Sequence, residues 1–79
     1  MKARIHITLK PGVLDPQGKA IENALSHLGF SGVENVRQGK LLELDLQETD
    51  QARARDKVDA MCKRLLANTV IESWHIELL

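Results

Sequence analysis

The stretch ARIHITLKPGVLDPQ, residues 3–17, holds a strand pattern, a break and a helix start in direct succession. From residue 4 to residue 10, polar and apolar side chains alternate, which is typical of a strand with one buried face. The Pro-Gly pair that follows interrupts the pattern. Asp15 then stands where an N-cap is favoured, and Pro16 occupies the first helical position, where its missing N–H costs nothing. This segment therefore predicts a β-strand followed by an α-helix.

The first helix is predicted to run from Pro16 to Leu28, and Gly29 suits a left-handed stop. Its apolar stripe has helical spacing and consists of Ile21, Ala24, Leu25 and Leu28. Gly18 lies in the first turn, where glycine lowers helix stability by about 1 kcal/mol relative to alanine. Gly18 indicates either the close approach of another backbone or partner, or only a slightly unfavourable residue in a helical turn that is already capped.

The region from Val33 to Leu46 is predicted to be extended, with Leu42 and Leu44 on the same face as Leu46. Val36 has the same parity, which favours one long strand. The Gln38-Gly39 pair equally allows a bend or a hairpin, and both readings stay open.

A second helix is predicted after a cap at Thr49 or Asp50, ending at Ala67-Asn68, where Asn tolerates the left-handed conformation. Its apolar stripe consists of Ala54, Val58, Met61, Cys62 and Leu65. A last strand begins near Val70 and places Trp74, Ile76 and Leu78 on one side, with Glu72 as a polar exception on that side.

These elements predict an α+β fold, a single domain over residues 1–79 in the order β-α-β-α-β. If the middle region folds back, the order becomes the ferredoxin-like β-α-β-β-α-β. Each helix has one apolar stripe, so we expect both helices on one face of a mainly antiparallel sheet. The opposite face would carry polar residues: Arg4, His6, Thr8, Glu43, Asp45, His75 and Glu77. A core this small rarely supplies more than about 3–5 kcal/mol, so we expect a homo-oligomer or docking onto a larger partner.

Composition argues against several classes of function. Eleven basic and 11 acidic residues give a formal net charge of 0, which disfavours nucleic acid or an anionic membrane as a partner. Cys62 is the only cysteine, so neither an intrachain disulfide nor a multi-cysteine metal cage is expected. The sequence has neither the apolar stretch of a signal peptide nor a run of about 20 apolar residues, so we expect a soluble, cytoplasmic protein.

No catalytic, cofactor-binding or metal-binding residue is predicted. Cys62 has apolar neighbours on its helix, which favours an inert core thiol over a nucleophile. A divalent ion held by His6, His75 and Glu77 is the alternative to solvated or interface histidines, and the latter are favoured. Arg37-Gln38-Gly39-Lys40 sets two cations around a glycine, which is a weak anion-site signal beside the favoured reading of an exposed basic bend.

Three segments taken together resemble the PurS family, the small subunits of bacterial and archaeal phosphoribosylformylglycinamidine (FGAM) synthase. They are VLDPQG at 13–18, VRQGK at 36–40 and MCKRLLANTVIE at 61–72. The resemblance covers essentially the whole chain. Trp74 stands where an aromatic residue, commonly Tyr, is usual in the family.

The resemblance implies a subunit of a ligase complex of purine biosynthesis, together with a synthetase, PurL, and a glutaminase, PurQ. The complex converts formylglycinamide ribonucleotide, glutamine and ATP into FGAM, glutamate, ADP and phosphate. The small subunit is then expected to be a non-catalytic homodimer or homotetramer that bridges the two enzymes and supports ammonia transfer. It would bind no cofactor itself, while the complex uses ATP and Mg. The interface candidates are Asp15, Pro16, Gln17, Gly18, Arg37, Gly39, Lys40, Asn68 and Thr69.

Two other functions are compatible with the same architecture. An acylphosphatase-like enzyme needs a phosphate-cradling loop with an Arg and an Asn, of which residues 32–33 and 36–39 give only a distorted echo. A stand-alone regulatory module that binds a small ligand would be stabilised by that ligand without any partner.

Overall fold

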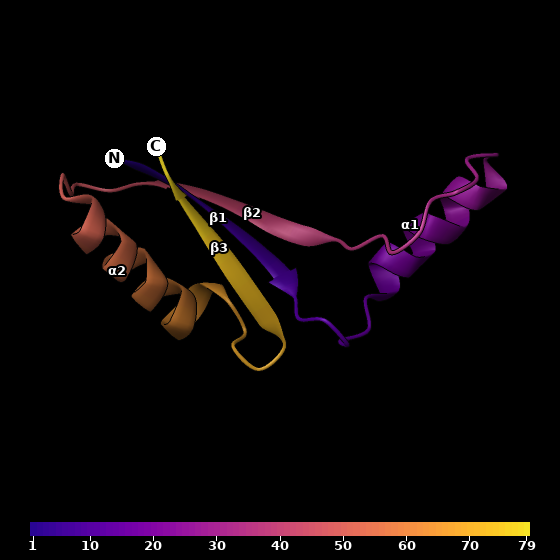
Figure 1. Ribbon diagram of the computed structural model, residues 1–79. Helices are drawn as coiled ribbons and strands as arrows, with labels where there is room; N and C mark the ends of the chain where they lie inside the picture. The colour runs from indigo at the N-terminus through magenta and orange to yellow at the C-terminus, as the bar shows by residue number, and fades with distance from the viewer.

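The computed structural model describes all residues from 1 to 79, and its elements follow the order β-α-β-α-β (Figure 1). They are β1 (Lys2–Leu9), α1 (Pro16–His27), β2 (Gly39–Asp45), α2 (Gln51–Met61), a π-helical turn η1 (Cys62–Leu66) and β3 (Glu72–Leu78). The α+β class is thus confirmed. Neither α1 nor α2 could serve as a membrane-spanning segment.

The sheet has three antiparallel strands in the order β2-β1-β3. In its centre, Ile5 lies opposite Leu42 on one side and Ile76 on the other, so the apolar residues of all three strands share one face. The middle region forms one strand that begins only at Gly39, and no hairpin occurs there. A β-carbon on Gly39 would lie 2.7 Å from the carbonyl oxygen of Ile7, so glycine permits this close pairing with β1.

The helix α2 and its π turn cover the apolar face of the sheet (Figure 1). The buried core consists of Ala3, Ile5, Ile7, Ala54, Val58, Cys62, Ala67 and Ile76. A hydrogen bond from Arg55 Nη1 to the carbonyl oxygen of Ile76, 3.3 Å long, adds a polar tie between α2 and β3. The predicted core role of Cys62 is confirmed, and burial raises the pKa of its thiol.

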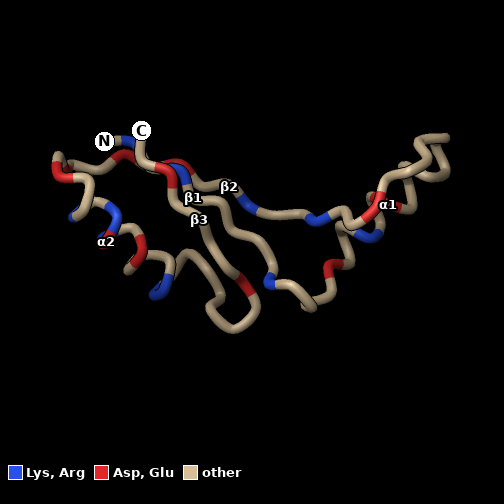
Figure 2. The backbone as a smooth tube through the Cα atoms, in the orientation of Figure 1, with Lys and Arg blue, Asp and Glu red and all other residues tan.

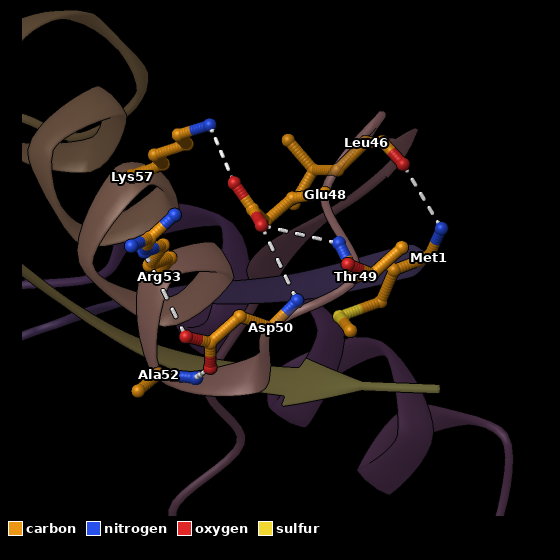
Figure 3. A network of polar contacts seen from close by, with 8 residues as sticks. All are labelled: Met1, Leu46, Glu48, Thr49, Asp50, Ala52, Arg53 and Lys57. Atoms are coloured by element: carbon orange, nitrogen blue, oxygen red, sulfur yellow. Dashed lines mark hydrogen bonds and ion pairs between the residues drawn. The ribbon is translucent and has the colours of Figure 1, made fainter.

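Of the two predicted caps, Asp50 is the residue that starts α2. Its Oδ1 accepts a hydrogen bond of 3.0 Å from the backbone N–H of Ala52 (Figure 3). Glu48 lies beside it, accepts from the backbone N–H groups of Thr49 and Asp50, and pairs with Lys57 at 2.8 Å (Figure 3). These contacts satisfy backbone donors at the helix start that have no partner within the helix.

The expected left-handed stop at Asn68 is wrong. The π turn ends the helix instead, with the N–H of Ala67 bonding the carbonyl of Cys62, and the backbone of Ala67 is already extended. Burial of Ala67 draws the chain toward the core. The side chain of Asn68 then accepts a hydrogen bond from the N–H of Val70 and shapes the turn into β3.

The expectation that both helices cover the sheet is also wrong, because α1 projects beyond its end (Figure 1). The molecule measures 48 × 25 × 14 Å, and its radius of gyration is 15.8 Å, against about 12 Å for a compact chain of this length. The reason is topological. Strands β1 and β2 are antiparallel neighbours, so the segments that join them through α1 both leave the same end of the sheet.

We call α1 and the return segment 28–38 the arm. The helix ends as predicted, with Leu28 as C-cap and Gly29 at φ +95°. The N–H of Phe30 bonds the carbonyl of Leu25, so the chain turns back along the helix (Figure 1).

Candidate functional site

The nine predicted interface residues come from three separate segments, and the structure brings these segments together where the arm leaves the sheet. We call this region the junction; it comprises residues 10–18, 36–40 and 68–72. The segments are tied to one another by backbone and side-chain hydrogen bonds, described in turn below. Charged residues along the rest of the chain are mixed in sign, and α2 carries both kinds (Figure 2).

Asp15 is the buried polar residue of the junction, with 6% of its surface exposed. It caps α1 as predicted, because its Oδ1 accepts a 2.8 Å hydrogen bond from the N–H of Gly18. Its Oδ2 accepts a second one, 2.7 Å long, from the N–H of Gln38. The Gln38 and Gly18 N–H groups, together with the positive charge of Arg37, hold the pKa of this carboxyl below its ordinary value.

Gly18 lies against the return segment. A β-carbon on Gly18 would lie 2.2 Å from the carbonyl oxygen of Val36, so the approach of another backbone, one of the two sequence interpretations, is the correct one. The N–H of Val36 donates to Glu22 Oε1 at 3.3 Å, and Glu22 Oε2 pairs with Lys19 at 3.1 Å. The return segment is thereby fastened along the first two turns of α1.

Arg37 points back to the segment that leaves β1. Its Nη2 donates to the carbonyl oxygens of Val13, at 2.9 Å, and Lys10, at 3.3 Å. Lys10 continues the chain of contacts, because its Nζ donates to the carbonyl oxygen of Thr69 at 2.8 Å. Residues 37–40 are exposed, as predicted for a basic bend, and within it Arg37 binds the chain's own backbone.

Glu72 links the two remaining segments and is a residue that sequence reasoning left out of the site. Its Oε1 accepts a 2.7 Å hydrogen bond from the N–H of Asn68, and its Oε2 lies 3.6 Å from Lys40 Nζ. The sequence did contain a sign of this role. Glu72 is a polar residue on the side of its strand that otherwise carries apolar residues. Gln38, the backbone partner of Asp15, gave no such signal.

A cleft of about 450 Å³ opens at the junction, on the part of the sheet that α2 leaves uncovered. Its floor is apolar and its rim is polar; the lining residues are Ile7, Leu9, Asp15, Pro16, Gln17, Gln38, Gly39, Lys40 and Glu72. The charged groups on the rim are already engaged with one another or with backbone groups. The arrangement offers a shaped surface with exposed Pro16 and Gln17 side chains, and it presents no nucleophile.

The histidines on the opposite, polar face form a second group. His6 Nε2 lies 2.7 Å from Glu77 Oε1, and the rings of His6 and His75 are 6.1 Å apart. Arg4 pairs with Glu43 on the same face, so the predicted polar face is confirmed. No three His, Cys, Asp or Glu side chains are arranged to hold a metal ion.

Comparison with known proteins places these features in a family. Residues 2–79 match the model of the PurS family, described as phosphoribosylformylglycinamidine (FGAM) synthase. The PurS subunit of Synechocystis is 51% identical over 75 residues, covering 95% of this chain and 75% of the relative. That of Bacillus subtilis is 44% identical over 77 residues, covering 96% and 89%.

Solved structures agree with the sequence relatives. The crystal structure of Methanocaldococcus jannaschii PurS superimposes with a TM-score of 0.87 at 41% identity, covering 96% of this chain and 92% of the other. A chain in the structure of PurLQS from Thermotoga maritima superimposes with a TM-score of 0.90 at 29% identity, covering 99% and 95%.

Proposed function

The chain belongs to the PurS family of FGAM synthase subunits, and we propose that it acts as a non-catalytic bridge between the synthetase PurL and the glutaminase PurQ. The occurrence of PurL, PurQ and PurS together in the Thermotoga maritima PurLQS structure supports this assignment of partners. In this role the chain holds the two enzymes in a geometry that lets ammonia released from glutamine reach the synthetase.

The observation that carries the proposal that this chain works within an assembly is the uncovered apolar surface of the arm. The stripe predicted to lie on the sheet faces outward instead, with Ile21 41% exposed and Leu28 74% exposed. Phe30, on the return segment, is 60% exposed. Large apolar side chains gathered on one exposed element in this way mark an interaction site.

The exposed area fits the same conclusion. The chain exposes 5844 Å², whereas a compact monomer of its mass exposes about 4,800 Å². The difference, roughly 1,000 Å², is comparable to the approximately 800 Å² that one partner contributes to a standard protein interface. Only ten of the 79 residues are buried, so the chain has a small core of its own and gains stability by association.

We assign the apolar stripe of the arm to a second copy of this chain, in a homodimer or homotetramer. The junction, with its polar rim and exposed loop at residues 68–69, is assigned to the larger subunits. This division follows the chemistry of the two surfaces, because obligate homo-oligomeric interfaces are more apolar than interfaces between separately stable proteins.

ATP and Mg²⁺ act on other subunits in this proposal. The junction contributes paired charges, and both oxygens of its buried carboxylate are occupied by backbone N–H groups of the chain itself. We further propose a cytoplasmic location, since the chain's single thiol, Cys62, is buried in the core and needs no oxidising compartment.

A reconstitution with purified PurL and PurQ tests the bridge. With glutamine, ATP and Mg²⁺ present, we expect FGAM synthesis to require this chain. With ammonium replacing glutamine, synthesis is expected to proceed without it, because PurL then needs no delivered ammonia. Equal glutamine-dependent rates with and without the chain would contradict the bridging role. Turnover of an acyl phosphate by the isolated chain would favour the enzyme alternative instead.

A further inference from the structure

The direction of the arm depends on the two segments that connect it to the sheet, because α1 lies beyond the sheet's end (Figure 1). One segment, residues 10–15, leads out from β1, and the other returns to β2 through residues 36–38. Two flexible connections alone would leave the arm free to swing. The contacts that join the connections therefore set the angle of the arm.

The carboxylate of Asp15 is the buried group that joins them. Asp15 bonds the first turn of α1 through Gly18 and the end of the return segment through Gln38, with one oxygen for each N–H. Its burial is unusual among the acidic residues, since it is the buried charged residue of the chain. Arg37 adds a second tie between the same two connections, from the return segment to the carbonyl of Val13.

We infer that Asp15 is the positioning residue of the arm, and that it sets the angle at which the arm meets its partner. This inference rests on the proposed role of the arm in assembly. A helix of 12 residues is about 18 Å long, so a rotation of about 15° at its base moves the far end by about 5 Å. A displacement of that size separates apolar side chains that must approach within about 4.5 Å to be in contact.

The function of Asp15 requires two acceptor oxygens. Asparagine has nearly the same shape and is an equally good N-cap, but it offers only one oxygen, and its NH₂ group donates. In Asp15→Asn the oxygen is expected to keep the cap on Gly18, which leaves the NH₂ group facing the N–H of Gln38. The variant therefore retains the helix and loses the tie.

Asp50 supplies a matched control. It caps α2 through the N–H of Ala52, and its other oxygen lies 3.8 Å from the exposed Arg53 side chain of the same helix. Asp50→Asn changes the same atoms at a helix start but breaks no connection between segments. Its effects measure the cost of the substitution itself.

Spin labels at Ser26→Cys in α1 and Ser73→Cys in β3 report the angle of the arm, while Cys62 remains buried and unlabelled. The labelled chain is diluted with unlabelled chain, so that only distances within one chain are read. We expect one narrow distance distribution for the parent and for Asp50→Asn, and a broad or displaced one for Asp15→Asn. Circular dichroism is expected to show equal helix content in all three.

Assembly is measured on the same proteins by sedimentation and by binding to PurL and PurQ. We expect Asp15→Asn to weaken assembly at least tenfold and Asp50→Asn to change it less than twofold. An unchanged distance distribution in Asp15→Asn, or a changed distribution with unchanged assembly, would overturn the inference. Failure of the parent chain to assemble would refute the proposed function, and the distances would still decide whether Asp15 sets the arm.

Discussion

The α-carbon of Gly18 faces the carbonyl oxygen of Val36 so closely that a β-carbon on it would lie 2.2 Å from that oxygen. The two residues belong to different segments, one in the first turn of α1 and the other in the segment that returns to β2. This contact explains why the first turn of the helix contains a residue that weakens helices. The backbone of the return segment occupies the space of the missing side chain.

Gly18→Ala is therefore expected to destabilise the arm, although alanine ordinarily strengthens a helix by about 1 kcal/mol. Overpacking against a backbone atom costs about 1–3 kcal/mol and exceeds that gain. Amide hydrogen exchange is expected to accelerate in α1 and to stay unchanged in β1. Asn23→Ala, at an exposed position of the same helix, is the control and is expected to slow exchange. Slower exchange in Gly18→Ala would contradict the steric explanation.

Acid is expected to loosen the junction through Asp15. The folded-state pKa of this carboxyl lies below its ordinary value of 3.8, so its contribution to stability is complete above that value and is lost as the pH falls through the folded-state pKa. The groups around it are Arg37, whose charge favours the ionised form, and Lys40 and Glu72, which line the same cleft.

The measurement is the free energy of unfolding of the parent and of Asp15→Asn between about pH 5 and pH 2. The parent is expected to be more stable at the upper end, and the difference is expected to shrink as the pH falls. Subtracting the two curves removes the acid sensitivity of Glu22, Glu48 and Asp59, whose pKa values are also lowered. A difference that stays constant with pH would show that ionisation of Asp15 does not stabilise the fold.

Trp74 ties β3 to α2 through its indole N–H, which donates to Asp59 Oδ1 at 3.0 Å. Asp59 also pairs with Lys63 at 2.9 Å. We expect Trp74→Phe and Asp59→Ala each to lower the free energy of unfolding by about 1 kcal/mol, the usual net contribution of such a hydrogen bond.

The double variant checks this pairing. Both substitutions remove the same interaction. The double variant is therefore expected to lose less free energy of unfolding than the sum of the two single losses, with a coupling energy of about 1 kcal/mol. Urea unfolding followed by circular dichroism measures all three variants. Strict additivity would mean that the indole N–H and the carboxylate do not stabilise each other.

The outward stripe of the arm gives a prediction about assembly. Leu28→Asp puts a charge on the apolar stripe and is expected to weaken self-association at least tenfold, or about 1.4 kcal/mol, because the carboxylate must lose its water on binding. Asn23→Asp adds the same charge on the opposite side of the helix and is expected to have little effect. Analytical ultracentrifugation over a range of concentrations measures both. Equal weakening by the two variants would point to net charge rather than to the stripe.

Local pattern alone was sufficient for most of the secondary structure. The start of α1 at Pro16, its glycine stop, a cap at Thr49 or Asp50 and the apolar face of each strand all depend on residues close together in the chain. Strand and helix periods, caps and left-handed glycines are effects of neighbouring residues, so they can be recognised without knowledge of the fold.

The sequence by itself determined the two helices, the outer strands and the family, left one strand or a hairpin open for the middle region, and marked nine residues that lie together at the junction. Only the tertiary structure decided that α1 extends beyond the sheet, that Asp15 joins two connections and that Arg37 binds the backbone of the segment that follows β1. Those features depend on the direction in which β1 and β2 leave the sheet and on contacts between residues more than 20 positions apart. An apolar stripe indicates that one face of a helix will be buried. It does not indicate whether that face packs against the same chain or against another.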